Sequence, residues 1–252
     1  MKKVTIVIPN YNGEKYIDEC FSALTKQSYK DFDVILADNG SEDNSISKAC
    51  QYKDKLDLNI KKLNCNYGFA KAVNEGIRQS QAEYVILLNN DTHAGRHFVE
   101  NLLKAIEMEK DVFAAQALML QYNSPELVDS AGDYFCALGV AFSAGKDKKA
   151  SLYKKKKDIF SACAGAAIYR RKIFEEIGYF EEEFFAYLED VEPFFRHRKN
   201  TCIHLCYIAA LSFQWHFDFS MQKYIFYIQA DFYSASSFCS CFGTTANHSA
   251  GF

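Results

Sequence analysis

The chain has 252 residues, 49% hydrophobic and 24% charged, enough for one sizeable α/β domain, and its net charge of −3 argues against a nucleic-acid partner. Nine scattered cysteines, an odd number, predict reduced thiols rather than a disulfide framework. No signal peptide is visible and no apolar run approaches the roughly 20 residues of a membrane span, so the expected location is cytoplasmic.

The N-terminal part alternates short apolar runs with amphipathic segments. Strands are expected at residues 4–8, 32–37, 58–63 and 84–88, and helices at 17–24, from a cap at Ser41 onward, and at 70–80. Uninterrupted apolar runs are typical of strands buried on both faces, as in parallel sheets. The alternation predicts the α/β class, with a doubly wound, mostly parallel sheet and helices on both faces.

Polar residues follow each expected strand, and the carboxyl ends of parallel strands meet at one sheet edge. Tyr11 could stack a base, Asp38 could accept a base N–H, and Gly68 would let a ligand approach the backbone closely. Neither the G-x-G-x-x-G of dinucleotide folds nor a P-loop is present. The pattern therefore indicates a nucleotide that is held by polar side chains and a metal.

The strand at 84–88 ends in a cluster of oxygen-bearing side chains, of which Asp91 carries the charge. A carboxylate beside amide and hydroxyl oxygens suits a hard divalent cation that also binds phosphates. The alternative is an ordinary Asn/Asp turn after a buried strand.

Four segments, residues 4–13, 36–41, 66–70 and 88–91, resemble in order and spacing the signature segments of the family 2 glycosyltransferases. The resemblance covers roughly residues 4–192. It implies a GT-A fold with a Rossmann-like nucleotide-binding half at about 1–95 and an acceptor-binding half at about 96–200. It also implies a nucleotide-sugar donor and Mg²⁺ or Mn²⁺ held by Asp91. The donor-binding residues that it implies are Pro9, Tyr11, Asn12, Asp38, Asn66, Gly68, Lys71, Asn89 and Asn90.

The acceptor side is expected in residues 161–192. Glu189 and Asp190 lie among aromatic residues, where burial should raise a carboxyl pKa toward values useful for a general base. The resemblance implies that Asp190 is the base and that Glu189 helps to position the acceptor. It places Gly165, Arg170 and Arg171 on the acceptor or diphosphate. Residues 181–183 are interpreted instead as an acidic helix start.

Two further segments carry hypotheses. Residues 129–132 resemble a loop that faces the donor in this family. The segment from Lys146 to Lys157 holds seven lysines. It is interpreted as a solvated loop, and it could also attach to anionic lipid or to the diphosphate of an acceptor.

The resemblance breaks after Glu192. Residues 201–252 hold only three charged residues and form an apolar tail rich in cysteine and aromatic residues. Two interpretations stay open: a divergent segment that docks on a membrane or partner, or the product of a reading-frame change. His216 lies near the distance at which family members have a histidine that completes the metal or diphosphate site.

The sequence thus predicts an inverting, metal-dependent transferase that uses a UDP- or dTDP-sugar. The expected acceptor is a glycan or polyprenyl-diphosphate-linked glycan of a cell-surface polysaccharide, at the inner face of the membrane. Rhamnose from dTDP-rhamnose is a guess from wording shared with rhamnosyltransferase-like members. The alternative is a nucleotide-sugar-binding protein that no longer transfers.

Overall fold

The computed structural model describes residues 1–108, 110, 112–135, 141–184, 189–190, 192–193 and the backbone of 206–215. Its largest element is one mixed sheet. The strands of this sheet are β1 (Val4–Asn10), β2 (Phe32–Asp38), β3 (Leu58–Lys62), β4 (Tyr84–Leu88), β5 (Thr92–Ala94), β6 (Ala114–Gln121), β7 (Ser124–Ser130), β10 (Asp158–Ile159), β11 (Ala166–Arg170) and β12 (Cys206–Trp215). A separate two-stranded sheet contains β8 (Asp133–Phe135) and β9 (Ala141–Ser143).

Strands of the large sheet follow the order β10-β12-β6-β11-β4-β1-β2-β3, with β7 paired to β6 and β5 paired to β12. The four strands from β4 to β3 are parallel, and β1 aligns with β2 from Val4–Phe32 to Asn10–Asp38. Strand β11 runs antiparallel between β4 and β6. This arrangement is a mixed sheet with a mostly parallel core, and it brings the carboxyl ends of β1, β2 and β4 together.

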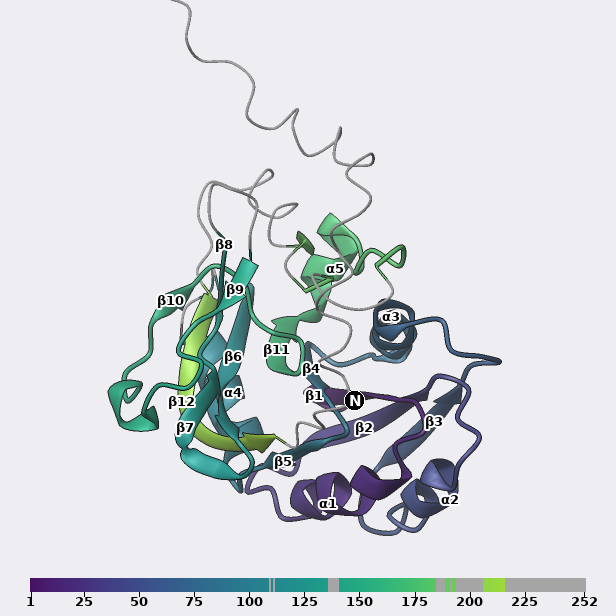
Figure 1. Ribbon diagram of the computed structural model, residues 1–252. Helices are drawn as coiled ribbons and strands as arrows, with labels where there is room; N and C mark the ends of the chain where they lie inside the picture. The colour runs from purple at the N-terminus through teal and green to yellow at the C-terminus, as the bar shows by residue number, and fades with distance from the viewer. Residues whose placement is uncertain are drawn as a thin grey trace, which may run out of the picture. The chain divides into compact units, whose positions relative to one another are not determined.

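Helices cover both faces of the sheet, as the sequence predicts (Figure 1). One face carries α1 (Glu14–Thr25), α2 (Ser45–Cys50) and α4 (Phe98–Glu107), and the other carries α3 (Phe69–Gln79) and α5 (Arg171–Ile177). Along β1, Ile6 and Ile8 belong to the first core and Val7 to the second. Both faces of the strand are therefore buried, which explains its uninterrupted apolar run.

Two local expectations are wrong. The helix expected from a cap at Ser41 begins at Ser45, because the Ser41 hydroxyl accepts the backbone N–H of Asn12 instead of capping a helix. Residues 181–184 form a turn rather than an acidic helix start. Glu182 of that turn binds side chains of α3.

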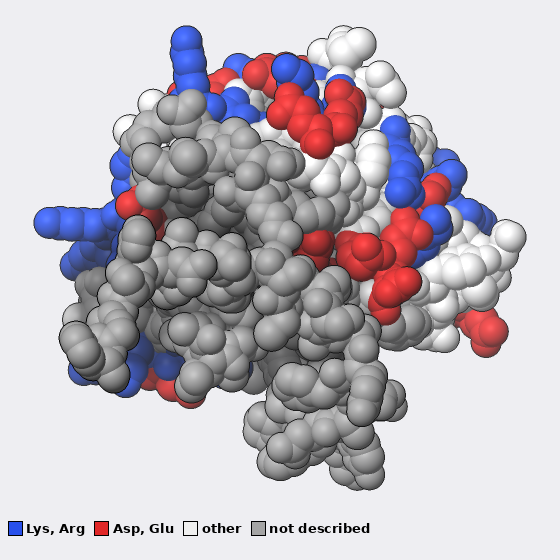
Figure 2. Space-filling model, turned by 90° about the horizontal axis from the view of Figure 1, so that it is seen from above, with Lys and Arg blue, Asp and Glu red and all other residues white. Residues whose placement is uncertain are grey.

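The described part of the apolar tail is β12, which pairs in parallel with β6 and antiparallel with β5 and β10. The rest of the tail, including His216, lies outside the described residues. No helix in the described ranges is long and apolar enough to cross a membrane. On the face seen from above, acidic and basic side chains lie next to one another over the described surface (Figure 2).

Candidate active site

Asn10, the last residue of β1, is the centre of a buried polar network. Its side-chain nitrogen lies 2.8 Å from a carboxylate oxygen of Asp38 and 3.0 Å from the hydroxyls of Ser41 and Ser45. Its side-chain oxygen accepts a 2.7 Å hydrogen bond from Asn90. The ends of β1, β2 and β4 are thus joined through one amide, as the parallel sheet predicts.

The absence of a side chain at Gly13 leaves room for the Asn10 and Asn90 amides to meet. A Cβ atom at Gly13 would lie 2.2 Å from the side-chain nitrogen of Asn90 and 2.3 Å from the side-chain oxygen of Asn10. Any side chain here would push the two amides apart. The glycine of the first turn is therefore required by the contact between β1 and β4.

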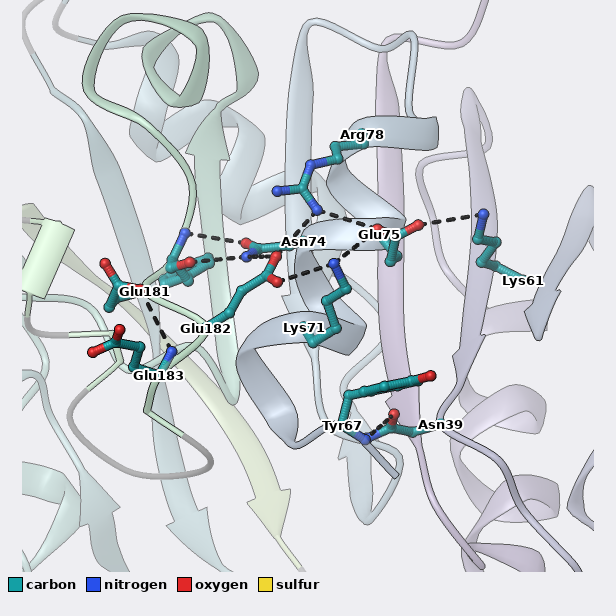
Figure 3. A network of polar contacts seen from close by, with 11 residues as sticks. Asn39, Lys61, Tyr67, Lys71, Asn74, Glu75, Arg78, Glu181, Glu182 and Glu183 are labelled. Carbon is teal, nitrogen blue, oxygen red and sulfur yellow. Dashed lines mark hydrogen bonds and ion pairs between the residues drawn. The ribbon is translucent and has the colours of Figure 1, made fainter. Parts of the chain in front are cut away.

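A second amide group joins β2 to the start of α3. The side-chain nitrogen of Asn39 donates to Asn66 Oδ1 at 2.8 Å and to the Gly68 carbonyl at 3.0 Å. The oxygen of the Asn39 amide accepts the Tyr67 N–H at 3.0 Å (Figure 3). Gly68 has φ of +87°, which favours glycine strongly, so this turn depends on it.

The remaining donor-side residues lie around these amides. Tyr11 is 49% exposed, so its ring is accessible for stacking, and the half-buried Pro9 lies two residues before it. The exposed Asn12 accepts the Glu42 N–H at 2.9 Å. Asp38 is 1% exposed and accepts hydrogen bonds on both carboxylate oxygens, so it is fixed before any ligand binds.

The end of β4 supplies oxygen atoms of the kind that a hard cation binds. Asn89 donates its backbone N–H to the Gly165 carbonyl at 3.0 Å. Its side-chain oxygen is buried and has no hydrogen-bond partner among the described residues. Burial, and then the charge of nearby Asp91, raise the pKa of the Cys20 thiol to about 12. An amide oxygen and a carboxylate two residues apart fit Mg²⁺ or Mn²⁺.

On the acceptor side, Asp190 lies next to the turn that precedes β11. One of its carboxylate oxygens accepts the Ala164 N–H at 3.2 Å. One carboxylate oxygen of Asp133, one of Asp190 and the Sγ atom of Cys163 all lie within 4.8 Å of one another. Glu189 beside them is 6% exposed. The structure therefore brings both expected acceptor-side carboxylates, together with Asp133, to the sheet edge that carries Asn89.

The sequence gives no signal for Asp133, although it follows the expected donor-facing loop directly. Residues 129 and 130 of that loop belong to β7. Burial, and then the charge of Asp190, raise the pKa of the Asp133 carboxyl to about 8, while a hydrogen bond with Ser143 opposes the shift. Asp133 is thus an acid of the site that the sequence does not predict and whose pKa burial raises.

Gln116 of β6 is a second residue without a sequence signal. It is fully buried and donates to the Ser130 hydroxyl at 2.9 Å. Its oxygen accepts the Cys163 N–H at 2.7 Å. Gln116 therefore holds the end of β7 and the turn before β11 at a fixed separation.

The structure does not bring Arg170 and Arg171 to this site. Ala166, at the start of β11, pairs with Leu88 at the end of β4, whereas Arg170 pairs with Tyr84 at the start of β4. The Arg170 guanidinium donates to the carbonyls of Val112 and Ile106, both at 2.7 Å. Arg171 donates to the Ala82 carbonyl at 2.8 Å. Both arginines therefore bind at the opposite ends of these strands, away from Asn89 and Asp190.

Lys71 lies in the first turn of α3 and forms an ion pair with Glu182 of the turn at residues 181–184 (Figure 3). Its ammonium group is 3.0 Å from Glu182, which also contacts Arg78 at 3.2 Å. Asn74 on the same helix donates to the Phe180 carbonyl at 2.8 Å and accepts the Phe180 N–H at 3.1 Å. The helix at the edge of the donor half thus holds the segment that leads toward Asp190.

The lysine-rich segment, residues 146–157, lies on the surface. Lys146 is 3.7 Å from a carboxylate oxygen of Asp129, and Lys157 lies over the ring of Tyr134. Leu152 within the segment is 72% exposed. Attachment of this segment to anionic lipid or to a diphosphate stays a prediction.

The sheet, its strand order and the amide and carboxylate groups at one edge define a protein of the GT-A class. The model of the family described as glycosyl transferase family 2 matches residues 5–178, and the chain belongs to that family. Solved structures show the same fold. GalNAc-T7 with UDP, GalNAc and Mn²⁺ has a TM-score of 0.70 at 12% identity, over 86% of this chain and 44% of that one.

Curated relatives agree with this assignment. TarS of Staphylococcus aureus, a poly(ribitol-phosphate) β-N-acetylglucosaminyltransferase, is 29% identical over 42% of this chain and 19% of its own length. The structure of TarS 1–349 with UDP has a TM-score of 0.61 at 22% identity, over 85% of this chain and 60% of that one. Uncharacterized glycosyltransferase RT0329 of Rickettsia typhi is 27% identical over 80% of this chain and 60% of its own length. The chain spans less than two thirds of either curated relative.

Proposed function

We propose that the chain transfers a sugar from a UDP-sugar to a hydroxyl group of a polymeric acceptor, with inversion at the anomeric carbon. One observation carries the proposal. Hydrogen bonds run from Asp38 through Asn10 to Asn90 on the donor side. The neighbouring Asn89 bonds to Gly165, and Ala164 bonds to Asp190. Donor-binding groups and a candidate base therefore share one sheet edge.

The relatives favour a UDP-linked N-acetylhexosamine over rhamnose as the donor to test first. TarS has been solved with UDP and with UDP-GlcNAc, and its name gives β-N-acetylglucosamine as the transferred sugar. No relative described above supports rhamnose, so rhamnose is not part of the proposal. The name of TarS likewise supports a polymer as acceptor. The exposed lysines of residues 146–157 would hold the protein at an anionic surface that carries such a polymer.

The chemistry that we assign to the site needs one base and no covalent intermediate. The acceptor oxygen forms a bond to the anomeric carbon while the bond from that carbon to the diphosphate oxygen breaks. Asp190 takes the proton of the hydroxyl group, because a sugar hydroxyl is a poor nucleophile until it loses that proton. The Ala164 N–H fixes the carboxylate for this role, and Glu189 lies next to it.

A divalent cation fits the donor side of this scheme. Asp91 and the buried side-chain oxygen of Asn89 would hold it, since both offer oxygen atoms and the Asn89 oxygen has no hydrogen-bond partner among the described residues. When bound, Mg²⁺ or Mn²⁺ would neutralise the charge that grows on the departing nucleoside diphosphate.

The decisive experiment separates binding from transfer. We expect UDP-GlcNAc with Mn²⁺ to raise the melting temperature of the wild type, because a ligand that binds only the folded state stabilises it. Asp190→Asn should keep this rise and lose about 10²- to 10⁴-fold in UDP release, the usual contribution of a general base. Asp91→Ala should lose most of the Mn²⁺-dependent rise.

Glu176→Gln on the surface of α5 is the matched control and should behave as wild type, because the described ion pair of Glu176 is an exposed one with Lys172. If the wild type binds UDP-GlcNAc but releases no UDP with any polymer acceptor, the alternative of a nucleotide-sugar-binding protein holds. Equal turnover in Asp190→Asn and the wild type would remove Asp190 as the base.

A further inference from the structure

We propose that Gln116 is a positioning residue for the transfer step. Its buried side-chain amide fixes the turn at residues 163–166, and this turn holds both Asp190 and the end of β4. The inference rests on the proposed role of Asp190 as the base. It goes beyond that role because it assigns a function in the reaction to a residue inside the sheet.

Gln116 is a polar exception in an apolar strand. It is fully buried in β6, and Ala114, Leu118 and Leu120 at alternating positions of the same strand belong to the second core. Burial of an amide is unfavourable unless hydrogen bonds replace its contacts with water. Natural proteins keep such exceptions to the local pattern mainly at functional sites. The place of Gln116 in the strand therefore points to a function beyond packing.

Both ends of the Gln116 amide bind groups from other parts of the chain. Its nitrogen donates to the Ser130 hydroxyl at the end of β7, at 2.9 Å. Its oxygen accepts the backbone N–H of Cys163 at 2.7 Å. The Cys163 carbonyl in turn accepts the Ala166 N–H at 3.3 Å, which closes the turn before β11. A side chain of the sheet therefore holds the first residue of that turn.

The turn at residues 163–166 makes two further contacts, one to each side of the site. The Ala164 N–H donates to a carboxylate oxygen of Asp190 at 3.2 Å. The Gly165 carbonyl accepts the Asn89 N–H at 3.0 Å. These groups belong to consecutive, planar peptide units of one short turn, so a shift at its first residue displaces them as well. The side chain that holds the start of the turn therefore also sets the positions of both contacts.

Loss of the Gln116 contact should affect transfer more than donor binding. The buried donor-side network joins Asn10, Asp38 and Asn90 by hydrogen bonds of its own. That network should keep its geometry when the turn shifts. Asp190 would instead lie at a different distance from the acceptor hydroxyl, and a misplacement of about 1 Å can lower a rate about 10²-fold.

The first test compares turnover with donor binding in Gln116→Met, which has a similar volume and removes both hydrogen bonds. With UDP-GlcNAc and Mn²⁺, kcat should fall about 10²-fold. The dissociation constant for UDP with Mn²⁺ should change far less. Gln116→Asn is the second variant, in case the methionine folds poorly, because its shorter amide cannot span both partners. A wild-type kcat in either folded variant, or an equal loss of UDP affinity, overturns the proposal.

Thr5→Val is the matched control, because it also removes two side-chain hydrogen bonds of a buried residue at nearly constant volume. The Thr5 hydroxyl donates to Asp33 at 2.7 Å and accepts from Ser80 at 2.8 Å, close to the amino end of β1. This variant should lose stability in urea, as Gln116→Met does, and keep the wild-type kcat. A comparable fall of kcat in Thr5→Val would show that turnover follows stability, and the positioning role would be overturned.

Ser130→Ala separates the two ends of the amide. It removes the acceptor of the Gln116 nitrogen and leaves the bond between the Gln116 oxygen and the Cys163 N–H in place. The kcat of Ser130→Ala should therefore stay much closer to the wild-type value than that of Gln116→Met. An equal fall in both variants would assign the effect to β7 and overturn the role of the turn.

The second test does not depend on activity and follows amide hydrogen exchange in residues 162–166. The Cys163 N–H loses its acceptor in Gln116→Met, so this segment should exchange about tenfold faster than in the wild type. The same segment should keep its protection in Thr5→Val. Unchanged exchange in Gln116→Met overturns the proposal. Absence of turnover in the wild type overturns the proposed function instead, and the exchange result then still decides whether Gln116 fixes the turn.

Discussion

The two sides of the site are built from different chemistry. On the donor side, neutral amides and hydroxyls surround one buried carboxylate, and Asn10 alone has four polar partners within 3.0 Å. On the acceptor side, the carboxyl groups of Asp133 and Asp190 lie within 4.8 Å of each other. The donor side is therefore a preformed support whose parts contribute stability. The proposed acceptor side instead places acids where burial disfavours their charged form, as the raised pKa of Asp133 indicates.

Replacing Asn10 by alanine should give the largest loss of stability, so it is the strongest test of the difference between the two sides of the site. Asn10→Ala leaves the Asp38 carboxylate, which is 1% exposed, without its amide donor. A buried charged group that loses a partner costs about 3 kcal/mol or more, so urea denaturation should show a loss of that size. Asp190→Asn should change the unfolding free energy far less. A larger loss in Asp190→Asn than in Asn10→Ala would reverse the assignment of the two sides.

Two glycines can separate site geometry from packing. Gly13→Ala and Gly76→Ala each insert a methyl group into a filled space and should cost about 1–3 kcal/mol by overpacking. The Gly13 methyl would press on Asn10 and Asn90, whereas the Gly76 methyl would lie 2.3 Å from a Val7 methyl group, inside the core. Isothermal titration should therefore show weaker UDP binding in Gly13→Ala only.

A companion substitution checks the cause of the Gly76 effect. Val7→Ala should restore part of the stability lost in Gly76→Ala, since it removes the methyl group in conflict. It should not restore UDP binding in Gly13→Ala. Equal loss of UDP binding in both glycine variants would show that the donor side responds to packing in general.

The contact between the two halves offers a smaller effect. Asn74→Ala removes two buried hydrogen bonds to the backbone of Phe180 and leaves both backbone groups without that partner. We expect a loss of about 2 kcal/mol. The variant should also lower kcat more than donor affinity, because Phe180 leads toward Asp190. A drop in donor affinity with unchanged kcat would contradict this function of α3.

The smallest effect is expected from Glu182→Gln. Glu182 contacts Lys71 and Arg78 in a network that is partly open to solvent (Figure 3). Such ion pairs contribute about 0.2–1 kcal/mol and weaken in salt. The difference in melting temperature between variant and wild type should therefore shrink from 50 mM to 1 M NaCl. A difference that does not depend on salt would assign the effect to the hydrogen bond with Asn74 instead.

The strands of the parallel core could be predicted because burial on both faces leaves a continuous apolar run. That rule predicts strands at residues 4–8 and 84–88; the structure has the second as predicted and extends the first through Pro9 to Asn10. Strands β8, β9 and β10 have two or three residues each, too few for any period. They exist because neighbouring chain segments pair with them.

Asp133 and Glu182 show why part of the site escaped prediction. The burial of Asp133 depends on pairing with Ser161, far along the chain, and no residue beside it in sequence announces that contact. Glu182 looked like one of three acids at a helix start, but its partners are on α3. In both cases the environment of the carboxyl group is set by a tertiary contact, which the hydrophobic pattern of the neighbouring sequence does not predict.

The arginine at the far end of β11 has a consequence for the integrity of the site. Gly165 directly precedes β11, and Arg170 is the last residue of the strand. A register shift of one residue would turn every side chain of β11 to the opposite face of the sheet. The guanidinium of Arg170 binds two carbonyls and the Tyr84 hydroxyl, a set that matches only one alignment. Arg170 thus fixes the register of β11 from its carboxyl end, and this register determines the position of the turn beside Asp190 at the other end of the strand.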